Sequence, residues 1–265
     1  MTYESGPWRL VRQLGAWASD TPWVRWLELG GSLGRGAGDE MSDVDAGIGI
    51  SLAPAEARAA ALAAARGFAP VAASFVQQLD GLDHLMVQYR DGRQLSLVLD
   101  PRPDRGGLPP GSKAMFDRTG ELAAPGQPGP LTASADDVRE WAFLAWWDLA
   151  DVAKHAKRGS AWRAIEALHE ARTMAWRLHA AALDLDYPVF GAVTVVNAKR
   201  PAPEGLDRTL AGTPEQALPA AIALADVLDR LTDRDDPDIA GIRDHALSSF
   251  RSTATTPAGP PTPSR

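Results

Sequence analysis

The chain has 265 residues, of which 45% are hydrophobic and nine are Trp, enough for one large globular domain or two of ordinary size. It contains no cysteine, which excludes disulfides, thiolate catalysis and cysteine zinc sites, and no apolar run approaches the ~20 residues of a membrane-spanning helix. Because the formal net charge is -7 and no signal-peptide pattern follows Met1, we expect a cytoplasmic protein without a membrane or nucleic-acid partner.

Residues 1–125 are expected to form an α+β domain. The helical spacing of apolar residues predicts a helix over residues 5–19, and an apolar run predicts a strand over residues 24–29. A Gly-Ser turn and a short helix then lead to a second strand over residues 43–50. An Ala-rich helix follows over residues 54–66, because proline at its start favours a first-turn position.

A hairpin is predicted where the dipeptide Asp91-Gly92 separates strands over residues 84–89 and 93–99. A Pro- and Gly-rich loop over residues 101–111 leads to a short edge strand over residues 113–117. Together these elements predict a mixed sheet with helices packed on it.

The second half of the chain has helical periodicity from residue 133 to 252, after a Pro- and Gly-rich linker over residues 125–130. Ser134, with Asp137 three residues on, resembles a capping box at a helix start. We expect an all-α bundle, and a disordered Thr/Pro/Ser-rich tail over residues 253–265. The predicted helices cover residues 134–158, 160–183, 214–232 and 237–251, with an irregular stretch over residues 187–212.

Two carboxylates follow the first strand at a spacing suited to a metal ion. Gly31-Ser32 is separated by ten residues from Asp43-Val44-Asp45. Side chains two apart on a strand share a face, so Asp43 and Asp45 can hold divalent cations together, and Mg²⁺ prefers carboxylates combined with substrate phosphates. The glycine backbone allows a triphosphate to approach, and Ser32 has a hydroxyl to donate. These residues predict a nucleotide site for phosphoryl chemistry.

The pattern Gly31-Ser32-x10-Asp43-Val44-Asp45 resembles the motif of the DNA polymerase β-like nucleotidyltransferase superfamily, and most closely its antibiotic nucleotidyltransferases, which modify aminoglycosides and lincosamides. The resemblance extends to about residue 120. It implies a catalytic domain ahead of an acceptor-binding helical bundle, an acceptor cleft between the two, Mg²⁺, and ATP as the donor. A hydroxyl of a small-molecule acceptor would attack the α-phosphorus and release pyrophosphate. The sequence does not define the acceptor, the base preference or the oligomeric state.

The resemblance also implies a third carboxylate four residues beyond Asp91-Gly92, where this chain has Ser96. In the family this acid holds a second metal ion and helps to deprotonate the attacking hydroxyl, whereas serine is a weak ligand and no base near neutral pH. Asp100 lies too far along the strand to share the metals. Three interpretations stay open: a base from the helical domain, a slow enzyme that uses Asp43 and Asp45 with one metal ion, or a protein that binds nucleotide without transferring it.

Glu166 and Glu170 are the candidate bases in the helical domain, because they share one stripe of the second predicted bundle helix with Arg163. The alternative is a solvated helix face on which Arg163 pairs with Glu166 and Glu170 pairs with Arg177. Two acids one turn apart on the preceding helix are further candidates of the same kind: Asp148 and Asp151.

Three other residue types invite a functional interpretation. Arg35 follows the Gly-Ser turn, where it either reaches triphosphate oxygens or lies exposed on a flexible loop. The five histidines show no metal-ligand spacing, and we interpret them as surface or packed residues. We interpret the tryptophans of the bundle helices as core residues: Trp141, Trp146, Trp147, Trp162 and Trp176.

Overall fold

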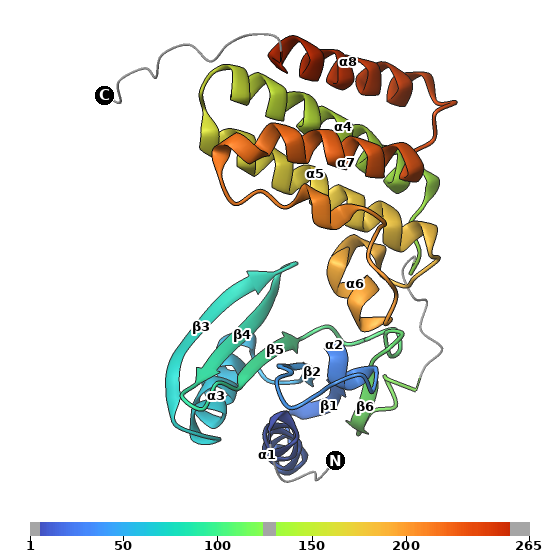
Figure 1. Cartoon of the computed structure of the whole chain (residues 1–265). Helices are drawn as coiled ribbons and strands as arrows, with labels where there is room; N and C mark the ends of the chain where they lie inside the picture. Colours follow the sequence, from blue (N-terminus) through green and yellow to red (C-terminus); the bar gives the residue numbers. More distant parts are fainter. Residues whose placement is uncertain (1–5, 124–130, 255–265) are drawn as a thin grey trace. The chain divides into compact units, whose positions relative to one another are not determined.

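Figure 1 shows a computed structural model of the chain, which describes residues 6–123 and 131–254. The chain divides into two compact units, Met1–Gly129 and Pro130–Arg265. The linker predicted over residues 125–130 lies outside the described residues, as do residues 255–265 of the predicted tail. Among the residues described, none of the helices has the length and apolarity that crossing a membrane requires.

The first unit is built on a six-stranded mixed sheet with the strand order β3-β4-β5-β2-β1-β6 (Figure 1). β2 and β5 are parallel, and the other neighbouring strands are antiparallel. The strands are β1 Val24–Leu29, β2 Val44–Ile50, β3 Val71–Leu79, β4 Leu82–Tyr89, β5 Gln94–Asp100 and β6 Lys113–Asp117. The helices are α1 Pro7–Asp20, α2 Gly31–Gly34 and α3 Pro54–Gly67.

The two faces of this sheet differ in character because strand side chains alternate between them. Val44 and Ile48 of β2 are buried in an apolar cluster with residues of α1 and α3, such as Leu14 and Ala61. Asp45, which has the opposite parity on the same strand, lies on the opposite face. The first unit therefore has one apolar face under helices and one face that carries polar side chains.

Strand β3 is missing from the elements predicted above. It is the edge strand next to β4, and most of its residues are exposed, so it lacks an alternating apolar pattern. Asp80 and Gly81, which connect it to β4, have φ angles of 50° and 80°, the two positive values of a type I′ hairpin turn. Asp80-Gly81 is therefore the same sequence signal as Asp91-Gly92, and it could have revealed the strand.

Every regular element described in the second unit is a helix. Ser134 and Asp137 form the predicted capping box at the start of its first helix. Residues 253 and 254, expected in the tail, are instead the last residues of the final helix, and the stretch predicted as irregular contains α6. The elements are α4 Ala135–Lys157, α5 Ala161–Ala182, η1 Pro188–Phe190, α6 Ala192–Asn197, η2 Leu206–Thr209, η3 Pro214–Gln216, α7 Ala217–Leu231 and α8 Pro237–Ala254. The α+β fold class, a mixed sheet with helices followed by an all-α bundle, is confirmed.

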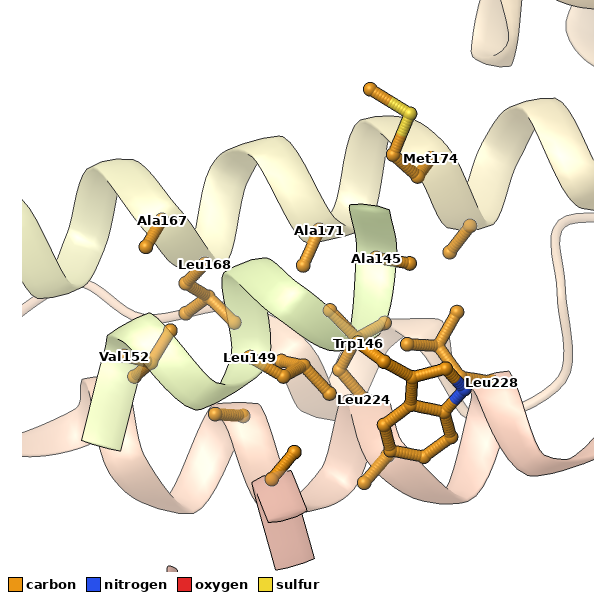
Figure 2. Close-up of a cluster of buried hydrophobic side chains, with 14 of the residues drawn as sticks. Ala145, Trp146, Leu149, Val152, Ala167, Leu168, Ala171, Met174, Leu224 and Leu228 are labelled. Atoms are coloured by element: carbon orange, nitrogen blue, oxygen red, sulfur yellow. The ribbon is translucent and has the colours of Figure 1, made fainter. Parts of the chain in front are cut away.

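The bundle core lies between α4, α5, α7 and α8, and Figure 2 shows Trp146 beside Leu224 and Leu228. Trp146 is fully buried and donates its indole N–H to Thr232 Oγ1 at 3.3 Å. Two of the tryptophans that we interpreted as core residues are exposed, so that interpretation is wrong for them: Trp147 is 52% exposed and Trp162 is 84% exposed.

Trp146→Ala should lower the free energy of unfolding of the helical unit by about 3–5 kcal/mol, because it removes a large buried side chain and leaves a cavity. Trp162→Ala, which removes the same side chain from an exposed position, should change it by less than about 0.5 kcal/mol. Urea unfolding followed by circular dichroism measures both. Equal losses in the two variants would contradict the assigned core.

Candidate functional site

The paired carboxylates lie on the polar face of the sheet. Asp43 directly precedes β2 and Asp45 is the second residue of that strand. Both line a cavity of about 640 Å³, together with Ser96 of β5. Phe75 of β3 and Met86 of β4 form an exposed apolar wall of the same cavity. The cavity thus places carboxylates next to apolar surface, an arrangement suited to a ligand with a charged part and a flat apolar part.

The glycine turn after β1 packs directly against Asp45. Gly30 donates its N–H to the backbone carbonyl of Asp45 at 2.8 Å. Gly31 has a φ of 58°, and a Cβ placed on it would lie 2.0 Å from Asp45 Oδ2. Both the conformation and the contact therefore require glycine at this position.

Ser96 occupies the position next to Asp45 in the parallel β2–β5 pair and hydrogen-bonds to its carboxylate. Behind it, His84 Nε2 lies 2.7 Å from Ser96 Oγ, and Gln77 Nε2 lies 2.9 Å from His84 Nδ1. With the Gln77 amide assigned as the donor to Nδ1, Nε2 carries the proton and donates it to Ser96 Oγ. The serine proton is then directed to Asp45, and a continuous chain of hydrogen bonds orients that carboxylate.

His84 is the site residue that the sequence analysis did not single out. Only 8% of its surface is exposed. His84 is therefore a packed residue, which is one of the two interpretations given for the histidines. The register of β4 on β5 pairs Met86 with Ser96 and puts even-numbered residues of both strands on one face. The hairpin at Asp91-Gly92 was therefore a signal for placing His84 near Ser96. Asp80-Gly81 was the corresponding signal for Gln77, because the hairpin at that turn pairs Gln77 with His84.

The charges at this site are incompletely neutralised. Burial raises the pKa of Asp45, and the neighbouring charge of Asp43 raises it further. The hydrogen bond from Ser96 and the charge of Arg35 act in the opposite direction. Two carboxylates that repel each other at a cavity wall are stabilised by a bound cation.

The donor set fits a Mg²⁺ ion that also binds phosphate. Within residues 6–123 and 131–254, no group of three or more His, Cys, Asp or Glu residues is arranged to hold a metal ion. Asp43 and Asp45 therefore provide two carboxylates, and substrate oxygens or water have to complete an octahedral shell. Arg35 is exposed after α2 and close enough to affect the pKa of Asp45, so Gly31 and Arg35 both lie near that acid, whereas the role of Ser32 stays a prediction.

The two predicted bases lie on α5 in the helical unit. Glu166 is exposed and pairs with Arg163 at 2.6 Å, as the solvated-face interpretation predicts. Arg177, the partner suggested for Glu170, instead donates its Nε to the Val189 carbonyl at 2.9 Å. The role of either glutamate as a base stays a prediction.

Asp148 on α4 is a carboxyl group on which the charge of Glu170 acts. Burial raises the pKa of Asp148 to about 6, with further contributions from the charges of Glu170 and Asp151. A half-buried carboxyl with a pKa close to neutrality, beside a second acid, is suited to proton transfer.

Comparisons with known proteins add a weak likeness in structure. No protein-family model matches the chain, and no curated protein sequence matches it. Among solved structures, an aminoglycoside 6-adenyltransferase from Bacillus subtilis is similar over 93% of this chain and 97% of its own, with 11% sequence identity and a TM-score of 0.39. At this level the likeness does not assign a function.

Gly31→Ala should cost the first unit about 3 kcal/mol of unfolding free energy, because left-handed strain adds to a clash with Asp45. Gly36→Ala is the matched control: Gly36 has a φ of 72°, and a Cβ placed on it would meet no atom within 4 Å. It should cost about 1 kcal/mol from strain alone. Denaturant titration compares the two, and equal costs would show that the Gly31 contact has no energetic weight.

Asp148 should make stability depend on pH. Its pKa rises from 3.8 in the unfolded chain to about 6, so the folded state binds more protons and stability falls as pH rises through this interval. Asp148→Asn should remove that fall and stabilise the unit by about 1 kcal/mol above pH 7, after allowance for solvent screening of a half-buried group. Thermal unfolding from pH 4 to 8 measures it. Glu140→Gln, an exposed change on the same helix, should leave the pH profile as it is.

Proposed function

We propose that the chain is a Mg²⁺-dependent nucleotidyltransferase that transfers a nucleoside monophosphate, AMP from ATP, to a hydroxyl of a small antibiotic-like acceptor. The observation that supports this most is the packing of the Gly31 backbone against Asp45, with Asp43 alongside, at one cavity. This contact brings the turn proposed to hold phosphate next to the acids proposed to hold the metal ion. The sequence motif that resembles the nucleotidyltransferase superfamily contains the same residues.

Each residue has a defined part in this proposal. Asp43 and Asp45 hold Mg²⁺, which when bound neutralises charge on the phosphate oxygens. Gly31 and Ser32 hold the β- and γ-phosphates through backbone N–H groups and the serine hydroxyl, and Arg35 pairs with triphosphate oxygens. The acceptor oxygen forms a bond to the α-phosphorus as the bond from that phosphorus to the β-phosphate bridging oxygen breaks, and pyrophosphate leaves. Positioning and charge neutralisation provide most of the rate enhancement.

The proton of the acceptor hydroxyl passes to a carboxylate in this proposal, Glu166 or Glu170. Glu170 is the better base of the two, because Glu166 is held in an ion pair with Arg163. Glu170 also lies close enough to Asp148 for its charge to raise the pKa of that carboxyl.

A second function is favoured by one observation, the hydrogen bonding of Ser96. Its hydroxyl bonds to Asp45 and to His84, so it occupies the place of the third carboxylate without supplying a charge. A protein built in this way binds a nucleotide and one metal ion without transferring the nucleotide.

Calorimetric titration with α,β-methylene-ATP tests the nucleotide site. We expect Mg²⁺-dependent binding by the wild-type chain, and at least a tenfold loss of affinity in Asp43→Asn, because one of two metal-binding carboxylates is removed. Glu40→Gln, an exposed charge change on the same loop, should bind as the wild type does. Binding that ignores both Mg²⁺ and Asp43→Asn would contradict the assigned site.

Release of labelled pyrophosphate from ATP, across a panel of hydroxyl-bearing small molecules, separates the two candidate functions. Transfer predicts release with at least one acceptor and its loss in Asp43→Asn. Mg²⁺-dependent binding without release from any acceptor, in a chain where Ser96→Asp also restores none, favours the binding protein.

A further inference from the structure

A second cavity lies wholly within the helical unit. It measures about 320 Å³ and is formed by one face of α5 and by Phe190, Gly191 and Ala192 at the junction of η1 and α6. The helix α5 contacts both of these short elements, so the cavity has walls on two sides. The residues that α5 contributes recur at helical spacing on a single face: His169, Arg172, Thr173 and Trp176.

Arg172 is the unusual residue of this cavity, because its charge has no partner among the described residues. Its Nε is buried without a hydrogen-bond partner. Burial lowers the pKa of the Arg172 guanidinium, and no neighbouring acid opposes that effect. Two other arginines of the same helix do have partners: Arg163 pairs with Glu166, and Arg177 donates to a backbone carbonyl.

Arg172 Nε is buried without an ion pair or hydrogen bond, although burial of part of a charged group is normally compensated by one of these. The chain has 34 acidic residues, and none of those described is placed to compensate Arg172. A bound anion would supply the missing partner. The guanidinium presents its donors in a fork that matches the two oxygens of a carboxylate or phosphate.

The other walls indicate what the anion is attached to. Trp176 and Phe190 line the cavity, and Phe190 is 63% exposed. Gly191 has a φ of 54°, and a Cβ on it would lie 3.1 Å from Trp176 Cβ, so glycine lets the chain pass close to the tryptophan. The aromatic side chains offer flat apolar surface next to the arginine.

We propose that this cavity binds a small molecule that carries an oxyanion, either a carboxylate or a phosphate, on a flat apolar group. Arg172 forms a bidentate pair with the oxyanion, and Trp176 and Phe190 contact the apolar group. The site consists of residues of the helical unit alone and does not depend on the proposed nucleotidyl transfer, so the two stand or fall separately.

Titration of the full chain with benzoate and with phenyl phosphate, followed by ligand-observed NMR, tests the proposal, with benzamide as a neutral probe of similar shape. We expect at least one of the two anions to bind at least tenfold more tightly than benzamide. Arg172→Gln should weaken the binding of that anion at least tenfold, and Arg172→Lys should restore only part of it, because lysine keeps the charge without the fork. The tighter-binding anion identifies carboxylate or phosphate as the ligand chemistry.

Arg163→Gln is the matched control, since it removes the same charge from an exposed position of the same helix. It should leave binding unchanged. A second readout does not require the right ligand: Arg172→Gln should raise the melting temperature, because it removes a desolvated charge that has no partner. Equal binding of benzamide and both anions, equal losses in the two variants, no anion binding up to millimolar concentration, or a lower melting temperature for Arg172→Gln would each overturn the proposal.

Discussion

The approach of the Gly31 backbone to the Asp45 carboxylate is the constraint on which the first unit's site depends. It joins the end of β1 to the start of β2, because the residue before it, Gly30, also bonds to the Asp45 backbone. The backbone conformation of Gly31 needs glycine, and a Cβ on this residue would lie 2.0 Å from Asp45 Oδ2. The contact therefore holds the glycine turn directly against Asp45.

Ser96 limits the negative charge around Asp45. A carboxylate at that position would add a third negative charge beside Asp43 and Asp45, whereas the hydroxyl adds a directed hydrogen bond. The imidazole of His84 behind it supplies a further donor rather than another acid. In the proposed function, a site with two acids holds the cation less strongly than a three-acid site would, so phosphate oxygens have to contribute more of the coordination.

The sequence was sufficient for features that depend on local patterns. The turn, the position of Asp45 and the place of Ser96 on the second strand of a hairpin follow from glycine positions and from strand parity. The contact of His84 with Gln77 was harder to predict, because it depends on β3, an exposed edge strand with a weak apolar pattern that only the turn at Asp80-Gly81 signals. Arg172 was out of reach for a different reason, since a missing ion-pair partner is visible only once the whole neighbourhood is assembled.

The chain of hydrogen bonds that ends at Asp45 begins at Gln77, on the outermost strand of the sheet, and crosses β4 and β5 before it reaches β2. Edge strands open more readily than central ones, because they have a neighbour on one side only. Each opening of β3 releases the amide that holds the His84 ring in one tautomer and lets Ser96 turn away from the acid. The orientation of the Asp45 carboxylate would then fluctuate with the local opening of β3. Substitutions in β3 would alter the site without contacting a ligand.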